Sequence, residues 1–320
     1  MQLATLTYQR YLRSHGYSRH FWAWVRNKLI RFYADPSCRM LVHDKMLEMP
    51  LSHALPYYLQ KFPFYDALPV RLSHFIRDTA HFLKCVDIGA NIGDTIAAVS
   101  PCDTDSILAI EPNPKFSAYL RRNWEKTGKV EILNVLCSSS NKVELYTIKE
   151  KVGTASIVRD SNGILIQTMT LDDIIAQNKA FSHANFLKID TDGNDFEVIN
   201  GAKDTIRQNL PAVLFECDVF SNPSYLQDCL NTLLFFKHSG YESFLVYDNY
   251  GYLMGKHTFA NLVSFQNLLF YQLTSKFYYF DILIMREQDC SKFLDLERSY
   301  FANQISDESQ KRMVQESYLV

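Results

Sequence analysis

Residues 85–94 read C-V-D-I-G-A-N-I-G-D, and residues 107–112 read I-L-A-I-E-P. The apolar run that ends at Ile88 is typical of a short strand that is buried on both faces of a parallel sheet. Gly89 and Gly93 then let the backbone turn tightly and approach a ligand, and the helix that follows directs free N–H groups toward the same place. The stretch therefore predicts a strand, a ligand-cradling loop and a helix.

The second apolar run ends in Glu111, which Pro112 follows. In a doubly wound fold this position places a carboxylate where it can bind ribose hydroxyls. Asn113 and Pro114 are residue types that favour the N-cap and the first position of a helix. The loop alone equally fits an ordinary strand, turn and helix whose glycines serve geometry alone, but the linked Glu111 favours a cofactor site.

The loop differs from the dinucleotide fingerprint at one charged position. A dehydrogenase would show G-x-G-x-x-G, whereas this loop reads D-x-G-x-N-x-G, with Asp87 two residues before the first glycine. A carboxylate beside the phosphates of NAD would repel them. It suits a ligand that lacks phosphate and carries an amino group and a sulfonium, which describes S-adenosylmethionine.

Composition limits the classes of protein to which the chain can belong. A length of 320 residues and a hydrophobic content of 47% fit one large α/β domain with a smaller attachment. The net charge of −2 gives no global field that would attract nucleic acid. The seven cysteines form no C-x-x-C pair, which predicts free thiols in a reducing compartment. No signal-peptide core and no apolar stretch of membrane-spanning length are present, so we expect a cytoplasmic protein.

Three parts follow one another along the chain, with expected boundaries at 1–80, 81–290 and 291–320. The first is rich in aromatic and basic residues and is expected to be an attached helical segment. In the second, strands alternate with helices, which predicts a doubly wound α/β sheet. Its later strands are expected at 130–137, 186–190, 212–217, 241–247 and 277–285, with helices that begin at Thr170, Asp195 and Pro223. The polar tail is expected to pack loosely.

Five motifs, in this order and at these spacings, resemble the FkbM family of S-adenosylmethionine-dependent methyltransferases. They are V-D-I-G-A-N-I-G-D (86–94), I-E-P-N-P (110–114), T-L-D-D (170–173), L-K-I-D-T-D-G-N-D-F-E-V-I-N-G-A (187–202) and L-F-E-C-D (214–218). The resemblance covers residues 82–218. It implies a class I, Rossmann-like sheet of seven strands whose last strand is antiparallel, and O-methylation of sugars, polyketides or related hydroxylated compounds.

One departure from the family concerns the fourth motif. Many members carry D-V-E-G-x-E where residues 190–195 of this chain read D-T-D-G-N-D. The carboxylates are retained, but the second and third are shortened by one methylene, which alters the reach of any base or substrate contact.

The loop, the strand ends and the resemblance together predict the cofactor contacts. These are Asp87, Gly89, Ala90, Asn91, Gly93, Asp94, Thr95, Glu111, Pro112, Asn113, Cys137 and Asp190.

Methyl transfer from a sulfonium is an in-line displacement, and a sugar hydroxyl needs a base to accept its proton. Asp190 ends the fourth strand and is assigned to the cofactor or the acceptor, and Asp192 on the following turn is the expected base. Glu216 and Asp218 end the next strand and are predicted substrate contacts. Converging carboxylates repel one another unless they are protonated, hydrogen-bonded or bridged by a cation. A divalent metal is the less favoured alternative, and Asp195 is expected to cap its helix.

Lys188 lies within the fourth strand. It could neutralise part of this carboxylate group, but a lysine whose amine reaches water is the commoner outcome.

Two other segments are candidates for the acceptor pocket. Tyr57 and Tyr58, with Tyr65, are placed to stack on sugar faces, although a tyrosine in a chain this aromatic more often fills a core. The stretch 250–271 is longer than a hairpin needs and is a candidate lid.

The amino terminus carries six basic residues and no acid before Asp35. Trp22, Val25, Leu29, Phe32 and Tyr33 share one helical arc, which fits an amphipathic helix on an anionic membrane. Packing of that arc against the catalytic domain or against a second subunit in a homo-oligomer is equally compatible. Nucleic acid is not an expected partner, because no recognition motif accompanies the basic residues.

Three classes of function remain open. The favoured one is an O-methyltransferase that acts on a sugar hydroxyl, in a surface glycan or a glycosylated small molecule. The alternatives are an O-methyltransferase for a polyketide or lipid hydroxyl, and a noncatalytic cofactor-binding assembly protein. The intact Asp87, Gly89, Gly93, Glu111 and Asp190 argue against the last.

Overall fold

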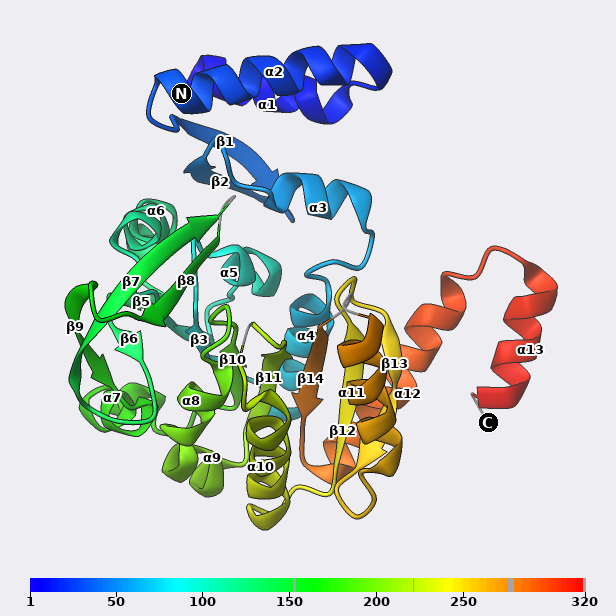
Figure 1. Ribbon diagram of the computed structural model, residues 1–320. Coiled ribbons are helices and arrows are strands. Elements are labelled where there is room, and N and C mark those ends of the chain that lie inside the picture. The colour runs from blue at the N-terminus through cyan, green and yellow to red at the C-terminus, as the bar shows by residue number, and fades with distance from the viewer. Residues whose placement is uncertain (152–153, 221, 276–278, 319–320) are drawn as a thin grey trace.

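The computed structural model describes residues 1–151, 154–220, 222–275 and 279–318, and a mixed sheet of eight strands is its centre (Figure 1). Across the sheet the strands are β5 (Val130–Leu133), β4 (Ser106–Ile110), β3 (Lys84–Ile88), β10 (Phe186–Ile189), β11 (Ala212–Cys217), β14 (Phe280–Ile284), β12 (Ser243–Asp248) and β13 (Leu253–Thr258). The five from β5 to β11 are parallel, and β14 is antiparallel to both of its neighbours. This confirms the predicted doubly wound sheet with an antiparallel last strand.

Helices cover both faces of this sheet. In the catalytic region they are α5 (Asp94–Val99), α6 (Pro114–Trp124), α7 (Leu171–Gln177), α8 (Asp195–Asn200), α9 (Lys203–Asn209), α10 (Tyr225–His238) and α11 (Val263–Ser275), with short 3₁₀ turns at Glu125–Thr127 and Lys179–Phe181. Thr170 caps α7 by accepting the Asp173 amide, and Asn113 caps α6 by accepting the amides of Lys115 and Phe116, both as predicted.

The strands divide their side chains between two cores, as period-two alternation requires. On β11, Ala212 and Leu214 belong to one core, whereas Val213, Phe215 and Cys217 belong to the other. The first core continues into the amino-terminal segment and the second lies under α7 to α11. Every second residue of β3, β10, β11 and β14 therefore faces the amino-terminal segment.

That amino-terminal segment consists of α1 (Gln2–Arg13), α2 (Gly16–Phe32), the antiparallel hairpin β1 (Ser37–Val42) and β2 (Lys45–Pro50), α3 (Leu55–Lys61) and α4 (Leu68–Ala80). The hairpin is a feature that the helical prediction did not contain. Its alternate residues Cys38, Met40 and Val42 enter the first core, so their burial stabilises the hairpin.

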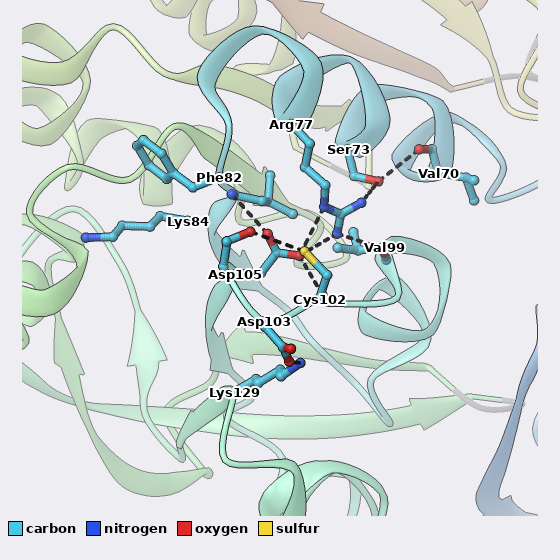
Figure 2. Close-up of polar contacts among 12 residues, drawn as sticks. Val70, Ser73, Arg77, Phe82, Lys84, Val99, Cys102, Asp103, Asp105 and Lys129 are labelled. Atoms are coloured by element: carbon cyan, nitrogen blue, oxygen red, sulfur yellow. Dashed lines mark hydrogen bonds and ion pairs between the residues drawn. The ribbon is translucent and has the colours of Figure 1, made fainter.

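A buried ion pair ties α4 to the sheet (Figure 2). Arg77 donates from Nε and Nη2 to one oxygen of Asp105, at 3.0 and 2.7 Å, and from Nη2 to the Val99 carbonyl at 2.9 Å. Asp105 also accepts the backbone amides of Leu83 and Cys102, at 3.1 and 2.8 Å. One carboxylate thus joins α4 to the start of β3 and to the turn that precedes β4.

Residues 130–137 do not form the single strand that was predicted. The chain leaves the sheet at Asn134, whose side-chain amide donates to the carbonyls of Glu111 and Pro112 at 2.7 and 3.0 Å. β6 (Leu136–Cys137) then joins β9 (Ile164–Met169), β7 (Val143–Lys151) and β8 (Thr154–Arg159) in a separate four-stranded sheet. The hydrogen bonds at Asn134 bend the chain where the sequence shows only an apolar run.

The helix that was expected to begin at Asp195 does begin there as α8, but a break at Gly201 and Ala202 separates it from α9. A Cβ on Gly201 would lie 2.1 Å from the Ser138 carbonyl oxygen, so the helix end passes close to the chain after β6. This tertiary approach explains the break.

The candidate lid at 250–271 consists mainly of one strand and part of one helix. Its first half contains β13, which extends the sheet beyond β12 as an eighth, edge strand, and its second half is α11, which buries Phe265 and Leu269. Only its start, at Tyr250, lines the cavity described below, among the residues that the structure describes.

The polar tail does not pack loosely along its whole length. α12 (Glu287–Asn303) buries Phe293, Leu294 and Ala302, and its buried Glu297 accepts two hydrogen bonds from Arg71 on α4, at 2.5 and 2.8 Å. α13 (Glu308–Tyr318) has no buried residue. In the sequence of α12 the apolar residues are interspersed with charged ones, so the polar composition of the tail did not reveal that this helix has a buried face.

Candidate active site

The loop after β3 crosses the end of β10 at close range. The amides of Gly89 and Ala90 both donate to the Ile110 carbonyl, at 2.9 and 3.1 Å. Gly89 has φ +86°, and a Cβ there would lie 1.7 Å from the Asp190 carbonyl oxygen. Gly93 has φ +88°, and a Cβ there would collide with the Trp124 ring. Both positions require glycine, as the sequence predicted.

Glu111 is fixed between this loop and the start of α6. One carboxylate oxygen accepts the Asn91 amide at 2.8 Å and the other accepts the Asn113 amide at 2.7 Å. Burial raises the pKa of Glu111 to about 7, although the two amides favour the charged form. The side chain is 5% exposed and lines a cavity. The carboxylate is therefore oriented before any ligand arrives.

The cavity, of about 720 Å³, lies where the parallel strands end. Of the predicted cofactor residues it is lined by Gly89, Asn91, Asp94, Glu111, Pro112, Cys137 and Asp190, and of the predicted acceptor residues by Asp192, Glu216, Asp218 and Tyr58. One continuous space thus joins the two sets. Its volume is in the range of small-molecule and cofactor sites.

The other predicted contacts lie outside the lining of this cavity. Ala90 and Thr95 are buried beside the loop. Gly93 is the N-cap of α5, and the side-chain oxygen of Asn113 accepts the hydrogen bonds that cap α6. Tyr57 packs its ring 6.4 Å from that of Tyr11 and 5.1 Å from the Arg19 guanidinium. These residues therefore contribute to the structure around the cavity without lining it.

Asp87 is also outside the lining, and its partner is Lys188. Because both face the amino-terminal segment at paired positions of β3 and β10, the Lys188 amine lies 3.9 Å from Asp87 Oδ1. The same amine donates to Asp190 Oδ2 at 2.9 Å. Burial raises the pKa of Asp87 to about 6, and Lys188 opposes the rise. Burial alone would lower the pKa of Lys188, but Asp190 and Asp87 raise it well above its usual value.

The expectation that Lys188 extends its amine to water is therefore wrong. The lysine is 8% exposed and neutralises the carboxylate group.

The same alternation places Glu216 of β11 directly opposite Asp281 of β14. Burial, followed by the charge of Asp190, raises the pKa of Glu216 well above its usual value and that of Asp281 to about 8. Burial and then Asp66 raise the pKa of Asp94 to about 8. Protonation of these groups relieves the repulsion that a row of carboxylates would otherwise create.

Asp195 does not cap its helix. One oxygen accepts from the amide and hydroxyl of Thr191, at 3.3 and 2.9 Å, and the other accepts the Glu216 amide at 3.3 Å. Asp195 thus fixes the loop that carries Asp192, which has φ +50°, to the neighbouring strand. Within the described part of the chain, no cluster of three or more ligating side chains is arranged to hold a metal ion.

Aromatic rings form another part of the cavity wall. Tyr58 stacks on Tyr65 with ring centroids 5.3 Å apart, and Phe62 stacks on Tyr250 at 4.3 Å. Tyr279, just before β14, completes this wall. Tyr250 and Tyr279 lie far from Tyr58 in sequence, so the fold alone brings them together.

Sequence reasoning missed His53 altogether. It lies between β2 and α3, is 5% exposed and lines the cavity. Its Nδ1 accepts the Leu55 amide at 3.2 Å, and its Nε2 lies 3.4 Å from Asn91 Oδ1. Burial lowers the pKa of His53 to about 4, so the ring is neutral. A lone histidine in a segment outside the recognised motifs gives no sequence signal for such a contact.

Comparison with known proteins agrees with this site. A model of the methyltransferase FkbM domain matches residues 87–252. No curated protein matches the chain. Among solved structures, a methyltransferase FkbM from Methylobacillus flagellatus KT is 20% identical over 48% of this chain and 37% of that chain, with a TM-score of 0.34. The match thus spans little more than a third of that protein.

Two further structures share less sequence. A precorrin-6y C5,15-methyltransferase from Geobacter metallireducens GS-15 is 13% identical over 64% of this chain and 80% of that chain, with a TM-score of 0.34. The METTL16 MTase domain is 10% identical over 82% and 78%, with a TM-score of 0.40. The family model covers more than half of the chain and includes the loop, Glu111 and the carboxylate-bearing strand ends. The chain belongs to the FkbM family of methyltransferases, whose reaction is methyl transfer from S-adenosylmethionine.

Proposed function

We propose that this protein transfers the methyl group of S-adenosylmethionine to a hydroxyl of a sugar, in a surface glycan or a glycosylated metabolite. The observation that carries the proposal is the single cavity that joins Glu111 and the glycine loop to Asp190, Asp192 and a wall of tyrosines.

The residues at one end of the cavity fit the cofactor. The buried Glu111 carboxylate is suited to two ribose hydroxyls, and Gly89 lines the same cavity. Asp94 and Asp190 supply carboxylates for the amino group. When bound, S-adenosylmethionine supplies the electrophilic methyl group.

The residues at the other end fit a sugar. The wall formed by Tyr58, Tyr65 and Tyr250 offers aromatic faces to the apolar C–H faces of a pyranose. The carboxyl groups of Glu216 and Asp218 can accept hydrogen bonds from hydroxyls, and Glu216 Oε2 is buried without a hydrogen-bond partner among the described residues. A hydroxyl donor would satisfy that oxygen.

The chemistry then depends on alignment and on one base. Holding the acceptor oxygen in line with the methyl group can supply about 7–11 kcal/mol of the barrier reduction. A carboxylate that accepts the hydroxyl proton adds on the order of 10²–10⁴-fold. We assign this role to Asp192, because Asp190 already accepts a hydrogen bond from Lys188 whereas Asp192 lies on the loop beyond it, at the cavity wall.

Calorimetric titration tests the cofactor half of the proposal. S-adenosylmethionine, S-adenosylhomocysteine and NAD are titrated separately, each with magnesium and with a chelator. We expect saturable binding of the two adenosyl ligands and none of NAD. Affinity that disappears with the chelator would instead assign a cation to the carboxylates.

An acceptor panel tests the other half. Transfer of labelled methyl is measured to glycosides, polyketides and lipids that differ in their free hydroxyls. We expect transfer to glycosides. Transfer to polyketide or lipid hydroxyls alone would favour the second class of acceptor, and cofactor binding without any transfer would favour a noncatalytic role.

A further inference from the structure

Helix α2 presents an aromatic face to solvent. None of its 17 residues is buried. Tyr17, Trp24 and Phe32 are 96%, 58% and 67% exposed, and Phe21 is also exposed. The spacings between these residues follow the three- and four-residue period of a helix, so they form one stripe. Isolated exposed aromatic residues are ordinary on soluble proteins, but a stripe along a whole helix marks an interaction site.

The stripe lies on a different arc from the one that the sequence indicated. Trp22, Val25 and Leu29 of the predicted arc are half-buried, and Leu29 packs against the core that includes α1 and the hairpin. Only Phe32 and Tyr33 of that arc are exposed. Part of the predicted arc is therefore half-buried, and a second aromatic face is exposed.

Cations accompany the exposed aromatic rings. The Lys28 amine lies 5.6 Å from the Trp24 ring and 5.4 Å from the Phe32 ring, and the Arg31 guanidinium lies 5.9 Å from the Phe32 ring. Arg10 and Arg13 of α1 are exposed as well. No acid precedes Asp35 in the sequence. The α1–α2 pair is thus a positively charged surface within a chain whose net charge is −2.

The position of this surface relates it to the active site. α1 and α2 lie beyond the hairpin and α3 at one end of the molecule (Figure 1). α3 supplies Tyr58 and Lys61 to the cavity lining. Among the described residues, no helix is both long enough and apolar enough to cross a bilayer. Any contact of this surface with lipid is therefore peripheral.

We infer that the exposed face of α2, with Arg10 and Arg13 of α1, docks on an anionic lipid bilayer. Trp and Phe side chains on a helix that lies in the interface enter the boundary between headgroups and acyl chains, while Lys and Arg bind anionic headgroups. A second copy of the chain is a poorer occupant. A two-fold interface would place this acid-free surface against itself and bring cations together.

Vesicle flotation tests this inference with the full-length protein. The protein is mixed with phosphatidylcholine vesicles that contain either no phosphatidylglycerol or about one third of it. We expect flotation with the anionic vesicles alone, and its loss at high salt because exposed charges are screened. Absence of flotation with anionic vesicles at low salt would overturn the proposal.

Two double variants separate the apolar and electrostatic contributions. Phe21→Gln with Trp24→Gln, and Lys28→Glu with Arg31→Glu, should each lower the vesicle partition coefficient by about tenfold or more. The matched control is Leu234→Gln with Lys237→Glu on α10, where an apolar and a basic residue are likewise exposed on one helix. An equal loss in the control would show a nonspecific effect and contradict the assignment of α2.

Fluorescence quenching locates the contact at Trp24. Vesicles that contain brominated phosphatidylcholine and phosphatidylglycerol should quench tryptophan emission, and Trp24→Phe should remove most of this quenching whereas Trp22→Phe should not. Duplex DNA that displaces the protein from vesicles and binds it as tightly would favour nucleic acid instead. Light scattering that shows a dimer dispersed by the Phe21 and Trp24 changes, with no vesicle binding, would favour a second copy.

Discussion

At the scale of single residues, period-two alternation explains why Asp87, Lys188, Glu216 and Asp281 meet. Each lies on the same face of its strand; Asp87 of β3 is paired with Lys188 of β10, and Glu216 of β11 is paired with Asp281 of β14. The cation at the centre of this row determines how many carboxylates can stay ionised. Lys188 is therefore as important to the site as the acids around it.

Replacing Lys188 tests this balance. Lys188→Met leaves the fully buried Asp87 without its cation, and we expect the free energy of unfolding to fall by about 3–5 kcal/mol at pH 8. The loss should shrink below about pH 6, where Asp87 is protonated. Denaturant unfolding at both pH values measures it. Lys84→Met on β3, whose amine donates to the Ala180 carbonyl, is the control and should change stability far less.

Glu111 carries a prediction for cofactor binding. Glu111→Ala should abolish detectable binding of S-adenosylhomocysteine, because two ribose contacts and the anchor of the loop disappear together. Glu131→Ala, an exposed acid on the neighbouring strand β5, should bind normally. Calorimetry decides between these outcomes, and normal affinity in the Glu111 variant would remove Glu111 from the site.

The raised pKa of Glu111 also sets a pH dependence. The folded protein holds this proton up to about pH 7, whereas the unfolded chain releases it near 4.5. The native state therefore binds more protons between these values, so this group makes stability fall as pH rises from about 4.5 to 7 and adds no slope above. In Glu111→Gln this part of the decline should be absent from the pH profile of unfolding. Ligand affinity of the wild type should weaken as pH falls below 7, since the protonated acid accepts fewer hydrogen bonds.

Asp192 carries the prediction for chemistry. Asp192→Asn retains the size of the side chain but cannot accept a proton, so turnover should fall by on the order of 10²–10⁴-fold while cofactor affinity stays the same. Single-turnover methyl transfer and calorimetry on the same preparation separate the two effects. Unchanged turnover would exclude Asp192 as the base.

At the scale of elements, buried polar contacts hold the amino-terminal segment on the sheet. Asp105 and Arg77 join α4 to the start of β3 (Figure 2). The glycine loop follows the other end of β3. Asp105→Asn removes the charge that compensates Arg77, so we expect a loss of about 3–5 kcal/mol at pH 7. Asp103→Asn breaks an ion pair between an exposed carboxylate and the partly exposed Lys129, and it should leave the unfolding midpoint unchanged.

The pKa of Asp105 determines how the stability difference between wild type and Asp105→Asn changes with pH. Despite burial, which acts to raise it, the pKa of Asp105 is lowered because Arg77 and the Cys102 amide favour its charged form. Its contribution is therefore present above the unfolded pKa of 3.8 and is lost as pH falls through the lower folded value. The stabilities of wild type and Asp105→Asn should converge in acid. A constant difference down to pH 2 would contradict this account.

At the scale of the whole molecule, the last two helices, α12 and α13, contribute differently to the stability of the fold. α12 returns to pack on α4 through the Arg71–Glu297 pair and through Phe293, which lies 5.2 Å from Phe75 between ring centroids. A chain that ends after residue 306 loses α13 only and should keep its unfolding midpoint and cofactor affinity. A chain that ends after residue 286 loses several buried side chains, each worth about 2–5 kcal/mol, and should not fold. Circular dichroism melts and calorimetry compare the two.

The sequence by itself determined the local features of the site. Gly89 and Gly93 are required by backbone geometry, and Glu111 is placed by the end of a strand, so both follow from patterns within a few residues. Strand alternation and helix caps at Asn113 and Thr170 are equally local. For that reason the alternation of strands and helices and the residues at the strand ends that line the cavity could be predicted from local patterns, whereas the antiparallel last strand was predicted from the family resemblance.

Only the tertiary structure decided what covers the strand ends. His53 and Tyr279 reach the cavity from segments before and after the recognised motifs, and the pairing of Lys188 with Asp87 depends on which sheet face the amino-terminal segment covers. The bend at Asn134, the break at Gly201 and the exposed face of α2 depend in the same way on distant contacts. Local sequence patterns specify periodicity and turns, whereas burial of one surface against another is set by the whole chain.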